Sequence, residues 1–300
     1  MPLPEPLDNP ETMREIQARA RAYADFIKLP FRNQIWRGQS GDFLGAGVGS
    51  SLDFQDHRSY VPGDDPRHIN WQAYARTGHY TMKLYREEVR PMVDLVLDAS
   101  ASMFFDPAKA RRVAETFYYA AESALRSGAA LRAHLLAADQ HRPLSDEAIF
   151  AHAWGDLAAG LKPAAPSLPP RLDLVPFRQG SMRILISDLL FPGNPEPFGI
   201  VLAQNRGRGM IFAPFCQAEA KADWQGNYEF VDSETRLRHQ RRVEPSILKR
   251  YRAAYLRHFE LWKSAAVKHG VLLARIPAEP AFQQAMQAEA IPFGAVELAG

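Results

Sequence analysis

Cysteine is almost absent from the sequence, which has one, Cys216, among 300 residues. A single thiol excludes an intrachain disulfide framework and any metal site made of several cysteines. Because Cys216 ends an apolar run that begins at Met210, we expect it to be a buried core residue.

Long apolar runs and a strong net charge are also missing. No run approaches the roughly 20 apolar residues of a membrane span, and the start MPLPEPLDNPETM lacks the basic and apolar segments of a secretory signal. The net charge of +2 is too small to indicate nucleic acid or an anionic membrane as a partner. With 46% hydrophobic residues, we expect a cytoplasmic globular protein with a full core and no direct membrane insertion.

The stretch from Met92 to Met103, MVDLVLDASASM, combines apolar and oxygen-bearing side chains. Its first part predicts a short buried strand that ends at Leu97. Asp98, Ser100 and Ser102 follow and present one carboxylate and two hydroxyls from a short loop. Such hard oxygen ligands suit Mg²⁺, which retains several waters, better than they suit zinc.

A second predicted strand, Met182 to Ser187, also ends in a carboxylate, that of Asp188. Parallel sheets gather functional residues at the carboxyl ends of their strands, beside the point where strand order reverses. We therefore expect Asp98 and Asp188 to share one site. The alternative is structural: the loop oxygens satisfy backbone donors at the turn, and Asp188 caps the next helix.

Residues 54–88 are rich in charged, aromatic and turn-forming side chains, and the run PGDDP that begins at Pro62 must turn sharply. Asp64 and Asp65 could form an acid/base pair, or His57 could act as a base, in a hydrolase. Adjacent carboxylates in a turn usually point different ways, so we expect them to pair with nearby arginines and lock the loop. The residues singled out as a partner-binding or structural segment are Arg58, Tyr60, Pro62, Gly63, Asp64, Asp65, Arg67, Trp71 and Arg76.

Two motifs together carry a resemblance to known proteins. The run RSYVPGDDPRHINW at residues 58–71, followed further along by D-x-S-x-S, resembles the bacterial domain-of-unknown-function family 58. The D-x-S-x-S loop resembles the metal-ion-dependent adhesion site (MIDAS) of von Willebrand factor type A domains. The resemblance implies a von Willebrand factor A-like domain in which Asp98, Ser100, Ser102 and Asp188 bind Mg²⁺.

The sequence departs from the implied pattern at two places. Asn70 stands where the family usually carries Asp before Trp. Sites of the von Willebrand factor A type use a further Thr oxygen, but the corresponding stretch at residues 166–177, PSLPPRLDLVPF, has no Thr. Ser167 or Asp173 would have to substitute for it.

Strands and helices alternate along the chain, which predicts an α/β fold with a mostly parallel central sheet and helices on both faces. Further strands are expected near residues 131–136, 141–150, 209–215 and 271–276, helices over 9–27, 106–128 and 245–269, and a hairpin over 228–237. We divide the chain into an N-terminal region, residues 1–91, and a von Willebrand factor A-like domain, residues 92–300. Basic residues cluster between Arg236 and Arg242, which indicates a solvated edge or a docking patch for an acidic protein.

For function, the resemblance implies a non-enzymatic adaptor whose protein partner supplies a carboxylate to the bound Mg²⁺. It also implies companionship with a MoxR-type AAA+ ATPase in chaperone-like assembly or activation. A metal-dependent hydrolase acting on phosphate or acyl substrates is one alternative. Another is a structural interaction protein whose metal site has decayed.

Overall fold

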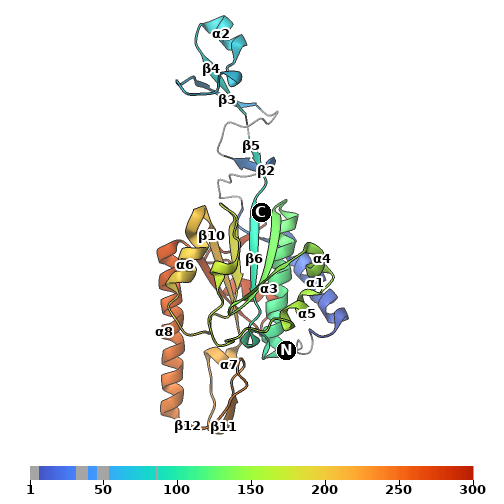
Figure 1. Cartoon of the computed structure of the whole chain (residues 1–300), viewed down its shortest axis with the longest axis vertical. Helices are drawn as coiled ribbons and strands as arrows, with labels where there is room; N and C mark the ends of the chain where they lie inside the picture. The colour runs from blue at the N-terminus through green and yellow to red at the C-terminus, as the bar shows by residue number, and fades with distance from the viewer. Residues whose placement is uncertain (1–6, 32–39, 46–53, 86, 300) are drawn as a thin grey trace. The chain divides into compact units, whose positions relative to one another are not determined.

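The computed structural model describes residues 7–31, 40–45, 54–85 and 87–299 (Figure 1). The chain divides into two compact units, a larger one of Met1–Phe31 with Met92–Gly300 and a smaller one of Arg32–Pro91. Helix α1 (Pro10–Phe26) is therefore part of the larger unit, although the sequence placed it with the smaller one in a single N-terminal region. Among the described residues, no helix has both the length and the apolar character needed to cross a membrane.

The larger unit is built on one six-stranded sheet (Figure 1). In spatial order its strands are β13 (Leu272–Pro277), β10 (Arg208–Phe215), β9 (Met182–Ile186), β6 (Met92–Asp98), β7 (Ala130–Ala137) and β8 (Gln140–Leu144). Neighbouring strands run parallel except β8, which pairs antiparallel with β7. The prediction of an α/β fold with a mostly parallel central sheet is confirmed.

The central strands are mostly apolar, with Asp94 in β6 and Arg183 in β9 as buried exceptions, which is typical of strands that helices cover on both faces. Every residue of β9 is buried, as are all residues of β6 after the first. On one face, Phe259 and Trp262 of helix α8 (Pro245–His269) pack in one cluster with Val96 and Leu185 of the sheet. On the other face lies α3 (Pro107–Arg126), which is almost wholly buried and packs against α1.

The remaining elements of the larger unit are short. The helices are α4 (Asp146–Phe150), α5 (Trp154–Ala159), α6 (Glu196–Ala203), α7 (Gln217–Ala220) and α9 (Phe282–Ala288), with 3-10 turns η2 (Ala101–Phe104), η3 (Leu172–Leu174) and η4 (Gln204–Arg206). Strand β1 (Ile27–Lys28) pairs with β14 (Glu297–Leu298), and β11 (Gly226–Val231) forms a hairpin with β12 (Arg238–Val243). The predicted hairpin is confirmed, but its second strand begins one residue after the expected span ends.

The smaller unit contains two antiparallel strand pairs. Strand β2 (Ser40–Gly45) pairs with β5 (Glu87–Val89), and β3 (Phe54–Ser59) pairs with β4 (Thr81–Tyr85). Between β3 and β4 lie the 3-10 turn η1 (Pro66–His68) and helix α2 (Trp71–Thr77). Asn70 begins α2 by accepting a hydrogen bond from the Ala73 amide, and Gly78 ends it in the left-handed conformation at φ +72°.

Candidate functional site

The candidate site lies where the strand order of the central sheet reverses. The chain passes from β6 to β7 on one side and later returns to the other side of β6 as β9. The register pairs Leu97 with Ile186, so the carboxyl ends of β6 and β9 are level. The Ser187 hydroxyl donates to Asp98 Oδ2 over 2.7 Å, and Asp188 follows directly. The structure thus brings the two predicted strand ends together at a switch point, where α/β sheets bind ligands.

Asp98 is a carboxylate held out of water. It is 0% exposed, and its Oδ1 accepts from the Ser100 amide at 3.0 Å. Burial and then the nearby charge of Asp188 raise the pKa of Asp98 from 3.8 to about 7, against the lowering effect of its serine hydrogen bonds. The fold therefore disfavours the charge on Asp98, and a cation beside it would favour that charge.

The two loop serines face each other. Ser100 Oγ and Ser102 Oγ lie 3.2 Å apart, and both residues are half-buried. Adjacent oxygens around an octahedral Mg²⁺, each about 2.1 Å from the ion, are about 3 Å apart. The hydroxyl pair therefore fits two neighbouring positions of a magnesium coordination shell in type and in spacing.

A buried lysine, Lys109, joins this site from the first turn of α3. Lys109 Nζ donates to Asp188 Oδ2 at 2.7 Å and to Glu219 Oε1 at 2.6 Å, with the lysine side chain 0% exposed. Burial lowers the pKa of Lys109, but Asp188 and Glu219 together outweigh it and raise the pKa overall, so the ammonium stays charged. Glu219 is itself fixed, since its Oε2 accepts from the Cys216 amide at 2.8 Å.

Cys216 has the structural role that the sequence predicted. It is 3% exposed and unpaired with another cysteine, and burial is the first cause that raises the pKa of its thiol to about 12. A neutral, buried thiol is chemically inert.

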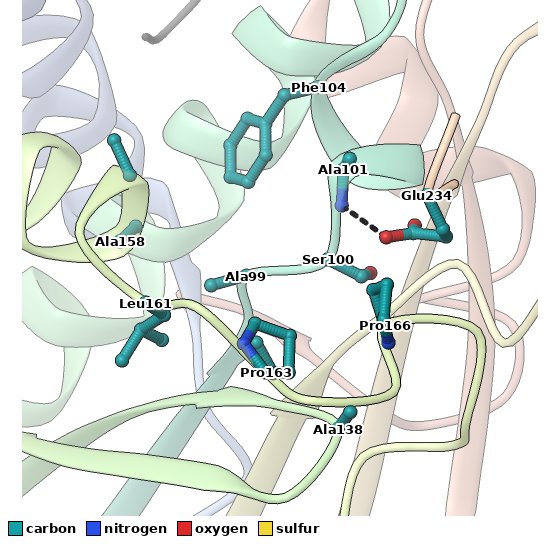
Figure 2. Close-up of a pocket in the computed structure, with 12 residues that line it drawn as sticks. Ala99, Ser100, Ala101, Phe104, Ala138, Ala158, Leu161, Pro163, Pro166 and Glu234 are labelled. Carbon is teal, nitrogen blue, oxygen red and sulfur yellow. Dashed lines mark hydrogen bonds between the residues drawn. The ribbon is translucent and has the colours of Figure 1, made fainter. Parts of the chain in front are cut away.

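Glu234 brings a further carboxylate to the loop. It lies in the turn of the β11–β12 hairpin and accepts from the Ser102 amide at 2.8 Å. It also accepts from the Ala101 amide at 3.1 Å, the hydrogen bond that is dashed in Figure 2. A cavity of about 150 Å³ adjoins this contact and is bordered by Ser100, Ala101 and Glu234 together with alanine, leucine and proline side chains. Figure 2 shows Leu161 and Pro163 on the far side of that cavity from Glu234.

The balance of charge at the site is negative. Asp98, Asp188, Glu219 and Glu234 are carboxylates, and Lys109 is the ammonium bonded to two of them. Among the described residues, no group of three or more His, Cys, Asp or Glu side chains is arranged to hold a metal. A cation here would depend on the serine hydroxyls and on water, which suits Mg²⁺. The donor set fits that ion.

Ser167 and Asp173, the residues considered as replacements for the missing threonine, are exposed to solvent. Asp173 Oδ2 accepts from Arg171 at 2.6 Å in an ion pair that is more than half exposed, and Ser167 is exposed. Asp173 is therefore occupied by Arg171. In the described contacts, Glu234 binds the loop of the candidate site, whereas Ser167 and Asp173 do not.

The predicted segment of the smaller unit is locked by ion pairs. Asp64 accepts from both terminal nitrogens of Arg58 at 2.7 Å, and this guanidinium is the first cause that lowers the pKa of Asp64 to about 2. Asp65 caps η1 and accepts from Arg67 at 2.7 Å. The expected pairing with nearby arginines is confirmed. The side chain of His57 lies outside the described residues.

Aromatic rings complete that segment. Tyr80 stacks on Tyr74 with ring centroids 4.5 Å apart and meets Trp71 and Tyr60 at 6.4 Å and 6.1 Å. Gly63 takes φ +107° in the turn, a conformation that favours glycine. Trp71 nevertheless remains 57% exposed, and Arg76 is exposed on the same helix.

Sequence reasoning missed three residues of the site: Lys109, Glu219 and Glu234. Each had a local signal. Lys109 stands in the first turn of a helix that directly follows the oxygen-rich loop, and Glu219 stands three residues after an N-cap. Glu234 stands in a D-S-E-T turn. None of these signals identifies the distant partner, which lies between 79 and 133 residues away.

Comparisons with known proteins agree with part of this picture. The sequence model of the family described as "Protein of unknown function DUF58" matches residues 56–260. No curated protein matches the sequence significantly.

Two solved structures from Bacteroides are similar to the chain. One is the conserved hypothetical protein BatB from Bacteroides thetaiotaomicron, 11% identical with a TM-score of 0.36, covering 68% of this chain and 98% of that one. The other is an aerotolerance-related membrane protein from Bacteroides fragilis, 11% identical with a TM-score of 0.33, covering 67% and 96%. Likeness at this level adds nothing to the description of the fold or the site.

Proposed function

This chain belongs to the DUF58 family, and we propose that it is a non-enzymatic protein-binding module with a von Willebrand factor A-like fold and a Mg²⁺-dependent adhesion-type site. The ligands are Asp98, Ser100, Ser102 and Asp188. One observation carries the proposal: the two serine hydroxyls face each other at 3.2 Å beside a fully buried carboxylate at the switch point of the sheet.

Each residue has a distinct part in this proposal. Ser100 and Ser102 provide two neighbouring neutral oxygens, and Asp98 and Asp188 provide negative charge from the strand ends. Ser187 and the Ser100 amide orient Asp98, and Lys109 orients Asp188. When bound, the metal supplies a Lewis-acidic centre with an open coordination position, which an oxygen of a partner's carboxylate can fill. Affinity then depends on both the ion and one acidic residue of the partner.

Enzymatic hydrolysis has less support. A hydrolase would need a base, and the acid/base pair considered from the sequence consists of Asp64 and Asp65. Both carboxylates are held by arginines in the smaller unit. A carboxylate whose pKa is lowered to about 2, as that of Asp64 is, is a poor proton acceptor near neutral pH.

We further propose that the partner is a MoxR-type AAA+ ATPase, with the chain acting as an adaptor in assembly or activation of other proteins. The support is the resemblance of the Y-x-P-G-D-D and D-x-S-x-S motifs. The segment from Arg58 to Arg76 would offer a second, metal-independent contact through its exposed Trp71.

The first experiment measures Mg²⁺ binding by titration calorimetry on the metal-stripped full chain. Ser100→Ala and Ser102→Ala each remove one hydroxyl from the site, and Ser264→Ala removes an exposed hydroxyl of α8 as the matched control. We expect binding to the wild type and to Ser264→Ala, and loss of at least about tenfold in affinity in the two site variants. Equal affinity in all four proteins would contradict the metal site.

The second experiment tests the partner. A purified MoxR-type ATPase should bind the wild type in Mg²⁺, and the binding should be lost in EDTA and in Asp98→Ala. Capture that is unchanged by Asp98→Ala in Mg²⁺ would rule out a metal-bridged contact and would indicate a purely structural interaction protein.

A further inference from the structure

The loop of the candidate site already holds a carboxylate, and that carboxylate comes from the same chain. Glu234 Oε1 and Oε2 accept from the backbone amides of Ser102 and Ala101, and the contact joins residues 132 and 133 positions apart. The amides belong to the same residue run as the paired hydroxyls of Ser100 and Ser102. Glu234 therefore binds the backbone of the same loop that carries two of the proposed metal ligands, Ser100 and Ser102.

The turn that presents Glu234 is built to hold its shape. Asp232 Oδ1 accepts from the amides of Glu234 and Thr235 at 3.0 Å and 2.7 Å and from the Thr235 hydroxyl at 2.9 Å. The Asp232 amide donates to the Leu237 carbonyl at 2.9 Å and closes the turn. Glu234 is thus presented by a preorganised loop, and its contact with residues 101 and 102 is not the chance position of a long side chain.

The hairpin is anchored at its base, and most of the residues along its strands are exposed. At the base, Val243 packs in a small cluster with Ala222 and Leu248, and the Trp224 ring contacts Phe230. All the other residues of β11 and β12 are exposed except the partly buried Phe230. Release of the tip would break the two hydrogen bonds of Glu234 and leave the anchored base intact.

Two features around the contact describe what could take the place of Glu234. The adjoining cavity of about 150 Å³ is lined by apolar side chains, including those of Phe104 and Leu161, and has room for one apolar side chain. The strand that follows the turn exposes Arg241 and Arg242, and Arg238 is 70% exposed although it pairs with Glu229. Arg238 lies beside the turn, whereas Arg241 and Arg242 lie toward the base of the hairpin. Their positive charge attracts a negatively charged segment to the hairpin.

We propose that Glu234 is an internal occupant of the partner site, and that the partner segment carries an acidic residue next to an apolar one. Its carboxylate replaces that of Glu234 on the Ala101 and Ser102 amides, and its apolar side chain fills the cavity. The basic hairpin steers the approach. This inference rests on the proposed function, because the displaced contact lies on the same loop as the proposed metal ligands.

The test uses the whole chain and a fluorescein-labelled peptide, VDSELRL, which is the chain's own turn sequence at residues 231–237 with Leu in place of Thr235, so that an apolar residue stands next to the Glu. Wild type, Glu234→Ala and Glu229→Ala are compared by fluorescence anisotropy; Glu229 is an exposed carboxylate of the same hairpin and serves as the matched control. A tip docked about nine-tenths of the time leaves about one-tenth of the sites open, which weakens the apparent affinity of a competitor about tenfold. We therefore expect Glu234→Ala to bind the peptide about tenfold more tightly than the other two proteins.

Two further measurements decide whether the gain has the stated cause. A peptide with Gln in place of Glu should lose the tight binding to Glu234→Ala, and the amide resonances of Ala101 and Ser102 should shift in Glu234→Ala but not in Glu229→Ala. Equal peptide affinity for Glu234→Ala and wild type, or tight binding of the Gln peptide, would overturn the inference.

Running the assay in Mg²⁺ and in EDTA separates this inference from the proposed function. A gain in Glu234→Ala that needs Mg²⁺ supports both. A gain of the same size in EDTA supports the internal occupant and contradicts the metal-bridged contact. Mg²⁺ binding by calorimetry without any gain in Glu234→Ala supports the metal site and overturns the internal occupant.

Discussion

Replacing Asp98 with Asn should stabilise the larger unit at pH 8 in the absence of metal, even though Asp98 is a proposed ligand. The folded state raises the pKa of this carboxyl from 3.8 to about 7, mainly through burial and then through the charge of Asp188. A raised pKa means that the folded state is more stable when this carboxyl is protonated than when it is charged. The contribution of Asp98 to stability is therefore complete below pH 3.8 and is lost as the pH rises through 7.

The size of the effect follows from the shift. About three pKa units at 1.36 kcal/mol each correspond to a penalty of about 4 kcal/mol at pH 8 and of roughly 1 to 2 kcal/mol at pH 5. Asn preserves the local hydrogen bonds: its carbonyl can accept from the Ser100 amide, and its amide can donate to the Ser187 hydroxyl. The advantage of Asp98→Asn should therefore be about 2 to 3 kcal/mol larger at pH 8 than at pH 5.

Urea unfolding in EDTA at both pH values measures this difference. Asp94→Asn is the matched control, because Asp94 is equally buried in the same strand but accepts from Arg178 Nε at 2.8 Å. Its replacement leaves a guanidinium without its charge partner and should destabilise by about 3 kcal/mol at both pH values. An Asp98→Asn variant that is less stable than wild type at pH 8, or a difference that does not change with pH, would refute the reasoning.

Two other predictions concern buried charge. Lys109→Met should lower the free energy of unfolding by about 3 to 5 kcal/mol in urea, because Asp188 and Glu219 lose their shared ammonium. A triple variant that also carries Asp188→Asn and Glu219→Gln should recover part of this loss, because it has no unpaired buried carboxylate at these positions. Burial and then the neighbouring His141 lower the pKa of His134 from 6.5 to about 4, so its contribution to stability is present above pH 6.5 and is lost as the pH falls through 4. Between pH 7 and pH 4, the free energy of unfolding of His134→Gln should fall by about 3 kcal/mol less than that of the wild type. Urea unfolding of both proteins at both pH values measures this, and an equal fall in the two proteins would contradict it.

The framework of the fold could be predicted from sequence because it rests on local patterns. The runs that form β6, β9 and β10 are mostly apolar, so their burial could be inferred from composition even though each contains a charged residue. Asp106 and Pro107 mark the start of α3, and Gly270 marks the end of α8, through capping preferences that act within one turn. For the same reason, Asp98 and Asp188 could be placed at strand ends, and the switch-point rule then placed them together.

The rest of the site depends on contacts that no local pattern contains. The ammonium of Lys109 meets Glu219 across 110 residues, and Glu234 meets the loop across more than 130. Whether a turn such as D-S-E-T folds back on a particular loop depends on the register of the hairpin and on the packing of its base. The same limit applies to α1, whose grouping with the larger unit depends on its contact with α3.

The pairing of β1 with β14 has a consequence for the order of events during synthesis. Ile27 pairs with Leu298, so the first strand of the larger unit waits 271 residues for its partner. At about 5 to 20 residues per second, translation needs roughly 15 to 50 s to cover that distance. Helix α1 waits a shorter time for α3, and until α3 has emerged the apolar side chains of Met13, Ile16 and Ala20 cannot pack against it. The larger unit is therefore completed only when β14 has emerged from the ribosome.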